Sequence, residues 1–486
     1  MIAGPSYSAP SGSAKERVER EDLLMFVSAC FACTGQREFY SDGRGQAVSI
    51  DFLHRYVLGN YRSLYARTLT LGVNDFNQAL IVSNLLSTGK STTPSERSLE
   101  NALVTRALAR LPVHRAMHLL EALAKRRVNN RRTRAIIAAF LASPDQRDFR
   151  AVKYRRAFRR AAHHAHVGLG GELAPFFQNG WRERVYQTPL LESFRQAHFA
   201  ESKLYDLPFS IAEGLAAKHR VPRDVFLRRI EPRLTANERL RLQDASREAL
   251  GKAYAIDETR LSPTKLASFI LSRDDREEQR ASLHEALLLS TRRAVSRTAS
   301  RFGKVACVLD RSYSSSGSNE KRRRPLAVAL AVSYFLREAS REYRAFWTAP
   351  TADEVLVDAR GATDLATPIL DALDWAPELL ILVSDGFDND PPGVAAQVLE
   401  LAQKNLRAAP LCVHLNPVFD AESFAPKALG AGAVTMGIRA AEDLPTAVAL
   451  ASFAEARASL SDLVAHLDGR TERFLATDRK MHEASP

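Results

Sequence analysis

Cysteine is scarce in this chain: four thiols are spread over 486 residues, too few for a disulfide framework. No stretch approaches the run of about 18 apolar residues that a membrane-spanning helix needs. Met1 to Lys15 is rich in Ser, Pro, Gly and Ala, without the apolar segment of a signal peptide. We therefore expect a cytoplasmic protein with reduced thiols, no membrane segment and a disordered tail at residues 1–20.

A recognisable catalytic set is also missing. No Ser/His/Asp grouping or pair of carboxylates stands out, and the single CxxC at Cys30–Cys33 has no second pair to complete a zinc site. The segment Leu86–Ser91 resembles the end of a phosphate-binding loop, but Asn84 stands where the first glycine belongs. We expect a protein that is not an enzyme.

Acidic residues are locally depleted. Residues 101–170 hold 16 Lys and Arg against 3 Asp and Glu, a net charge of +13 beside the +12 of the whole chain. Residues 303–486 hold 19 against 25, a net charge of −6. A basic excess confined to one region is typical of a surface that binds a polyanion.

The basic excess forms two clusters, on a predicted helix-to-helix turn and on a later helix. Spacings of three and four place Arg156, Arg159 and Arg160 on one helical face. Arginine and asparagine suit contacts with phosphates and bases, and the alternative is a solvated basic face. The candidate nucleic-acid-binding residues are Arg126, Arg127, Asn130, Arg131, Arg132, Arg134, Lys153, Arg155, Arg156, Arg159 and Arg160.

Residues 21–300 carry one helix start signal after another. Thr93-Pro94-Ser95-Glu96 and Thr235-Ala236-Asn237-Glu238 are capping boxes. Starts near residues 93, 112, 130 and 145 predict short helices joined by short turns. We interpret this region as all-α, with antiparallel hairpins stacked as a HEAT-like helical repeat.

The pattern changes near residue 300 to alternating strands and helices. This alternation predicts an α/β domain at 303–470, a doubly wound, Rossmann-like parallel sheet, followed by a flexible tail at 471–486. The predicted strands are 305–309, 343–347, 379–383, 411–415 and 433–438, and the predicted helices are 325–340, 363–373, 394–405 and 445–467.

Oxygen-bearing side chains follow two of the predicted strands. Asp310, Ser312 and Ser314 come directly after the apolar run 305–309, Thr363 lies on a later loop, and Asp385 follows the run 379–383. Carboxylates and hydroxyls are hard ligands that suit Mg²⁺ or Mn²⁺ and not zinc. The ligand site of a parallel sheet lies at the carboxyl ends of its strands, where these residues fall.

This ordered set resembles the metal-ion-dependent adhesion site of von Willebrand factor type A (vWA) domains. The resemblance implies that Asp310, Ser312, Ser314, Thr363 and Asp385 hold a divalent ion with few direct carboxylates, which then attracts an acidic group of a partner. Arg311 and Tyr313 are bulky, and we expect them to narrow access to the ion. The cations Lys321, Arg322, Arg323 and Arg324 follow; they form either a pocket for an acidic partner or phosphate chain, or a solvated loop.

A basic helical-repeat half followed by a vWA domain resembles the TROVE/Ro family. In that family HEAT-like repeats close on the vWA domain into a ring, single-stranded RNA ends enter the hole, and structured small RNAs bind the outer basic face. The resemblance implies a non-catalytic ribonucleoprotein that binds small or single-stranded RNA. The alternative is a metal-dependent scaffold that grips an acidic protein partner, as vWA proteins that work with AAA+ ATPases do.

Overall fold

The computed structural model describes residues 14–40, 42–89, 92–144, 146–298, 301–455 and 460–476. Its contacts divide the chain into two compact units: unit 1 comprises residues 1–77 and 258–486, and unit 2 comprises residues 78–257. The sequence-based domains at 21–300 and 303–470 remain a prediction, and these units group the chain differently. Among the described helices, none combines the length and apolarity needed to cross a membrane.

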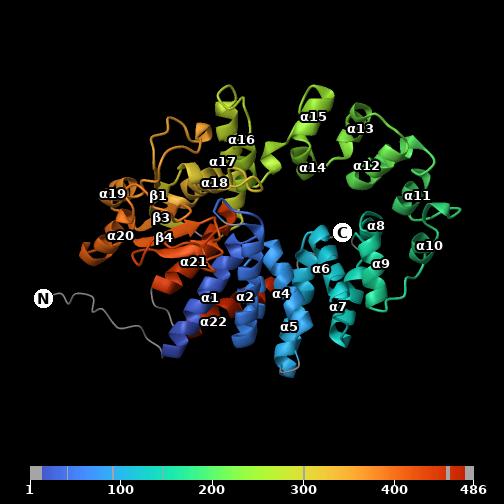
Figure 1. Cartoon of the computed structure of the whole chain (residues 1–486), viewed down its shortest axis with the longest axis horizontal. Helices are drawn as coiled ribbons and strands as arrows, with labels where there is room; N and C mark the ends of the chain where they lie inside the picture. Colours follow the sequence, from blue (N-terminus) through green and yellow to red (C-terminus); the bar gives the residue numbers. More distant parts are fainter. Residues whose placement is uncertain are drawn as a thin grey trace. The chain divides into compact units, whose positions relative to one another are not determined.

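Unit 1 is built around a parallel sheet of five strands in the order β2-β1-β3-β4-β5. Figure 1 labels three of them, β1, β3 and β4. The strands are β1 (Phe302–Leu309), β2 (Ser340–Trp347), β3 (Leu379–Val383), β4 (Leu411–Asn416) and β5 (Val434–Gly437). Every residue of β3 is buried, as expected where helices cover both faces of a parallel sheet. The alternating pattern of the sequence therefore predicted the sheet correctly.

Helices cover the sheet on both sides. The core of one face joins Ile369 and Leu399 to Val308 and Leu382 of the strands. Helix α18, which follows β1, is buried on almost every side. It packs on β1 and β2 and also against α16 and α17. The helices in question are α16 (Pro263–Leu271), α17 (Arg280–Ser296), α18 (Arg324–Ala339), α19 (Ala366–Asp374), α20 (Val394–Asn405) and α21 (Leu444–Glu455).

The two ends of the described chain meet in unit 1. Helix α1 (Ala14–Ala32) packs on β5, and the Gly437 amide donates to Ser28 Oγ at 2.6 Å. Helix α22 (Leu460–Ala476) contacts α1 and α3 (Arg62–Arg67). Tails were expected at residues 1–20 and 471–486, but residues 14–20 and 471–476 are helical. Residues 1–13 and 477–486 lie outside the described part of the chain.

Unit 2 contains helices and no strand in its described residues. Both predicted capping boxes are present, at Thr93 with Glu96 and at Thr235 with Glu238. The helices are α4 (Asp75–Ser87, shared with unit 1), α5 (Pro94–Arg110), α6 (Val113–Lys125), α7 (Arg131–Ala142), α8 (Arg147–Lys153), α9 (Arg155–His164), α10 (Leu173–Gln178), α11 (Pro189–Gln196), α12 (Phe209–Lys218), α13 (Arg223–Ile230), α14 (Ala236–Arg241) and α15 (Gln243–Leu250). Helix α6 packs on α9, and α7 packs on α5 and α9; a HEAT-like repeat remains a prediction.

Candidate cation site and basic surface

The carboxyl ends of β1 and β3 bring two aspartates to the same edge of the sheet. Leu309 pairs with Val383 at the end of the two strands, and the Asp310 amide donates to Val383 O at 3.0 Å. Asp385 follows β3 by two residues. The chain continues from β1 to β2 on one side, while β3 lies on the other, and ligand sites of open parallel sheets form at such a reversal of strand order.

Hydrogen bonds hold the serines against the first carboxylate. The Ser312 amide donates to Asp310 Oδ1 at 2.7 Å, and the Ser312 hydroxyl donates to Asp310 Oδ2 at 3.0 Å. Ser314 Oγ lies 3.2 Å from Ser312 Oγ. The Tyr313 amide donates to Gly361 O at 3.0 Å, so the loop that carries Thr363 runs alongside. All five predicted ligands are buried at this edge.

The protein balances the charges at this edge only in part, since Lys427 acts on Asp385. Burial, and then the neighbouring Asp385 carboxylate, raise the pKa of Asp310 to about 7. Burial also raises the pKa of Asp385, which Ser314 partly offsets. Asp385 Oδ2 nevertheless has no hydrogen-bond partner among the described residues. A divalent cation would neutralise both carboxylates and satisfy the orphaned oxygen. The residues therefore fit Mg²⁺ or Mn²⁺.

The donor set also disfavours zinc. Within the described part of the chain, no three His, Cys, Asp or Glu side chains gather as a metal-binding group. The edge offers two carboxylates and hydroxyls, which are ligands of hard cations. Cys30 and Cys33 are buried free thiols, and burial raises the pKa of both.

Three of the four cations predicted beside the metal serve the interior of unit 1. Lys321 is buried in an ion pair with Glu38, Arg323 donates to Leu271 O, and Arg324 donates to Arg439 O at 2.8 Å. These contacts engage three of the four cations, and a pocket for an acidic partner stays a prediction. Arg322 is exposed.

The two bulky residues between the ligands differ from each other. Arg311 is buried, and its guanidinium donates to Asp358 O and Pro350 O, so it does not narrow access to the site. Tyr313 is 67% exposed. The expectation was wrong for Arg311 because backbone carbonyls of the 350–358 loop accept its donors.

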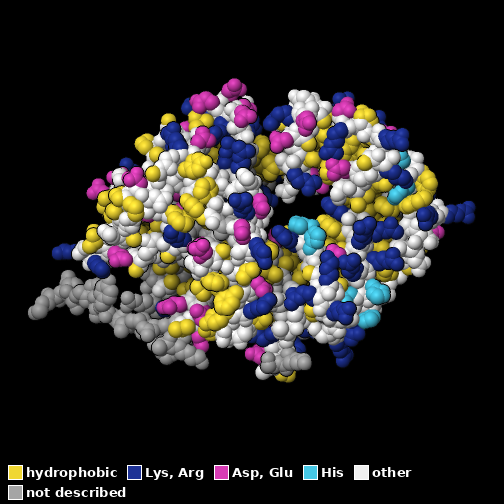
Figure 2. Space-filling model, viewed as in Figure 1, with side chains coloured by type: hydrophobic (Ala, Val, Ile, Leu, Met, Phe, Trp, Pro, Cys, Tyr) yellow, Lys and Arg dark blue, Asp and Glu magenta, His cyan; other side chains and the backbone are white. Residues whose placement is uncertain are grey.

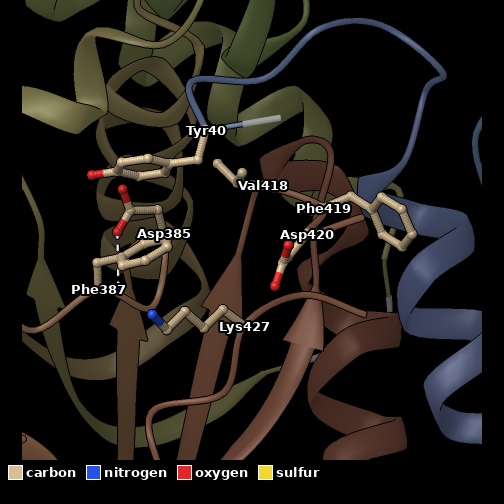
Figure 3. Close-up of a pocket in the computed structure, with 7 residues that line it drawn as sticks. All are labelled: Tyr40, Asp385, Phe387, Val418, Phe419, Asp420 and Lys427. Atoms are coloured by element: carbon tan, nitrogen blue, oxygen red, sulfur yellow. Dashed lines mark hydrogen bonds between the residues drawn. The ribbon is translucent and has the colours of Figure 1, made fainter. Parts of the chain in front are cut away.

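Beside Asp385 lies a hollow that the sequence did not reveal (Figure 3). Its lining residues are Tyr40, Asp385, Phe387, Val418, Phe419, Asp420 and Lys427. The Tyr40 and Phe387 rings are 4.3 Å apart, and Lys427 Nζ lies 3.4 Å from the centroid of Phe387. Tyr40 stands 270 residues before Asp310, so no local pattern could link them.

On unit 2, Lys and Arg side chains gather over α6 to α9, together with several histidines (Figure 2). Arg127, Arg131, Arg156 and Arg159 are exposed. None of these four forms an ion pair with any described residue of the chain. They are the predicted nucleic-acid candidates best placed to meet a polyanion.

The other candidates make contacts inside unit 2. Arg132 pairs with Glu100 at 3.1 Å, Arg155 donates to Phe176 O at 3.0 Å, and Asn130 caps α7 by accepting from the Thr133 amide at 2.8 Å. The remaining contacts are Arg126 to Ser83 at 2.9 Å, Lys153 to Glu238 at 3.8 Å and Arg160 to Glu121, while Arg134 is half-buried. These seven are not all free to contact RNA, because protein groups already engage most of them.

Comparison with known proteins shows the fold of the chain and no residue's role. No protein-family model matches the chain, and no curated protein matches it significantly. Among solved structures, the crystal structure of Deinococcus radiodurans RO (RSR) protein aligns with 90% of this chain and 100% of its own, with a TM-score of 0.52 and 16% identity. The chain has the fold of that Ro protein. At this identity the match carries no residue's role across.

Proposed function

We propose that this chain is a non-catalytic RNA-binding protein that holds small or single-stranded RNA on the basic surface of unit 2. The observation that carries the proposal is the group of four exposed arginines, Arg127, Arg131, Arg156 and Arg159, on a unit with 32 Lys and Arg against 17 Asp and Glu, a net charge of +15. Unpaired arginines are available to phosphates without first breaking a protein contact. The Ro-like fold and the TROVE/Ro resemblance point to the same class of ligand.

The second part of the proposal is a Mg²⁺ or Mn²⁺ ion held by Asp310, Ser312, Ser314, Thr363 and Asp385. Two buried carboxylates and an oxygen without a partner support it. The bound ion would supply positive charge that an external acidic group can share. This observation also favours the second candidate function, a scaffold that binds an acidic protein partner through the ion. The cytoplasmic location remains a prediction from the sequence.

The deciding experiment is a filter-binding titration of the whole chain with a short single-stranded RNA at several salt concentrations. If about five phosphates are contacted, tenfold more salt should weaken binding by roughly three to four decades, because bound phosphates release their counterions. Changing Arg127, Arg131, Arg156 and Arg159 to Gln should remove most of that dependence.

The matched control removes the same charge elsewhere in unit 2. The control uses four arginines from the segment between the start of α13 and the end of α15, each of which pairs with an acidic side chain: Arg228, Arg229, Arg233 and Arg247. Changing these four to Gln should leave the steepness of the salt dependence largely unchanged. Absence of binding below about 10 µM RNA at low salt, or equal losses in the two variants, would sink the RNA proposal and favour the scaffold.

A further inference from the structure

The connection between α1 and α2 (Gly43–Asn60) brings two aromatic residues to the candidate cation site. The Phe39 ring meets Tyr313 edge-on, with centroids 6.1 Å apart. The Tyr40 ring packs on Phe387, and Figure 3 shows it next to the Asp385 carboxylate. A segment from the start of the chain therefore borders a site whose other members come from the sheet.

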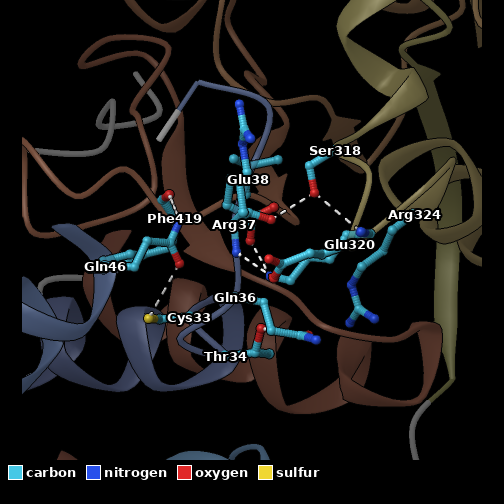
Figure 4. A network of polar contacts seen from close by, with 12 residues as sticks. Cys33, Thr34, Gln36, Arg37, Glu38, Gln46, Ser318, Glu320, Arg324 and Phe419 are labelled. Atoms are coloured by element: carbon cyan, nitrogen blue, oxygen red, sulfur yellow. Dashed lines mark hydrogen bonds and ion pairs between the residues drawn. The ribbon is translucent and has the colours of Figure 1, made fainter. Parts of the chain in front are cut away.

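The main chain of this connection is firmly attached (Figure 4). Glu38 pairs with buried Lys321, the Ser318 hydroxyl donates to Arg37 O at 2.7 Å, and the Arg37 amide donates to Glu320 Oε2 at 3.0 Å. All three contacts reach the loop between the serines and α18. The segment is thus held beside the site through its main chain and Glu38, while its last aromatic side chain, Tyr40, is 51% exposed.

The Tyr40 side chain lies beside Asp385, because both line the same hollow. Within the described residues, Asp385 also carries a buried oxygen without a hydrogen-bond partner. The Tyr40 ring therefore stands beside a residue that would hold the cation.

We propose that the Tyr40 ring covers the outward side of the cation site, so that a carboxylate ligand reaches the ion only after this ring moves off Phe387. The inference rests on the cation site of the proposed function and adds a residue that controls access to it. An aromatic pair of this kind is worth roughly a factor of two to ten in an equilibrium constant. Access through Tyr40 is thus restricted but not blocked.

The test uses the whole chain, Mn²⁺ as the ion and acetate as the carboxylate. Water-proton relaxation reports ligands that displace water from bound Mn²⁺. Tyr40→Ala should raise acetate affinity about two- to tenfold while Mn²⁺ affinity changes less. Tyr40→Phe, which keeps the ring, should gain less than Tyr40→Ala. The matched control is Tyr56→Ala, because the Tyr56 hydroxyl donates to Asp22 at 2.7 Å instead of facing the site; it should behave as the unchanged protein.

The outcomes separate this inference from the proposed function. Equal acetate affinity in the unchanged protein and Tyr40→Ala, with Mn²⁺ bound to both, overturns the cover alone. Mn²⁺ binding that appears only in Tyr40→Ala supports a tighter cover. No Mn²⁺ binding in either protein overturns the cover and the cation site together. Thermal unfolding of each variant, compared with the unchanged protein, shows whether its fold is kept.

Discussion

At the scale of single residues, His54 shows how burial fixes a protonation state. Its ring lies between the Tyr65 hydroxyl, 2.8 Å from Nδ1, and Asn77 Oδ1, 3.0 Å from Nε2. Asn77 Nδ2 donates to the carbonyls of Cys30 and Cys33, so its oxygen must face the histidine. The imidazole then donates from Nε2 and accepts from Tyr65 at Nδ1, which is a neutral tautomer.

Stability should therefore fall as acid is added. Burial lowers the pKa of His54 to about 4, below the value near 6.5 of an unfolded histidine. The contribution is complete above pH 6.5, and it is lost as pH falls toward 4, because the unfolded chain takes up the proton first. The loss at pH 4.5 should be about 2–3 kcal/mol. Urea unfolding of the unchanged protein and His54→Gln at pH 7 and pH 4.5 measures it.

The difference between these two proteins should shrink by that amount at the lower pH. His163→Gln is the control, since His163 is exposed. A difference that is the same at both pH values would mean that His54 takes up its proton at the same pH in the folded and the unfolded chain.

The sequence predicted that Asp310 and Asp385 meet at one edge of the sheet, but it did not predict their surroundings, for a physical reason. Asp310 and Asp385 each follow an apolar strand, and strand ends of a parallel sheet meet by construction. Tyr40 and Glu38 lie near this edge because α1 packs on the sheet, and such tertiary packing produces no pattern in the sequence of their own segment. The basic surface was predicted as a charge count, but burial and pairing decide which arginines remain free, and these depend on residues such as Glu100 and Phe176.

At the scale of elements, the contact of α1 with β5 depends on a glycine. A Cβ built on Gly437 would stand 2.1 Å from Ser28 O and 3.1 Å from the Ala32 Cβ. Only hydrogen at this position lets the helix backbone approach the strand, where the Gly437 amide donates to Ser28 Oγ. The sequence predicted each element of the sheet from its apolar run, but this contact joins residues 409 apart and was not predictable.

Gly437→Ala should lower the free energy of unfolding by roughly 1–3 kcal/mol or more, because α1 must shift to admit the methyl group. The control is Gly469→Ala in α22, where an added Cβ meets nothing within 4 Å. That change should stabilise the protein by up to about 1 kcal/mol, since alanine favours a helix. Thermal unfolding of the two variants should move in opposite directions; a shift of the same sign and size in both would contradict the close packing of α1 on β5.

At the scale of the whole molecule, charge is divided between the units. The net charge of the whole chain is +12 and that of unit 2 is +15, so the net charge of unit 1 is −3. The net negative charge of unit 1 does not attract a polyanion, whereas a cation at the proposed site there would bind a single carboxylate. The two proposed sites thus differ in ligand, range and dependence on salt.

The last prediction is that the two sites act independently. Asp310→Ala should abolish Mn²⁺ binding, followed by electron paramagnetic resonance of the free ion, and change RNA affinity by less than about twofold. The variant with Gln at the four unit 2 arginines should lose RNA affinity and keep its Mn²⁺ affinity. Any coupling between two binding sites is reciprocal, so both variants should report the same independence. Asp310→Asn, which nearly keeps the shape of the side chain, guards against a folding defect. If Asp310→Asn loses RNA affinity and EDTA causes the same loss in the unchanged protein, RNA contacts the cation face and the division of roles between the units is wrong.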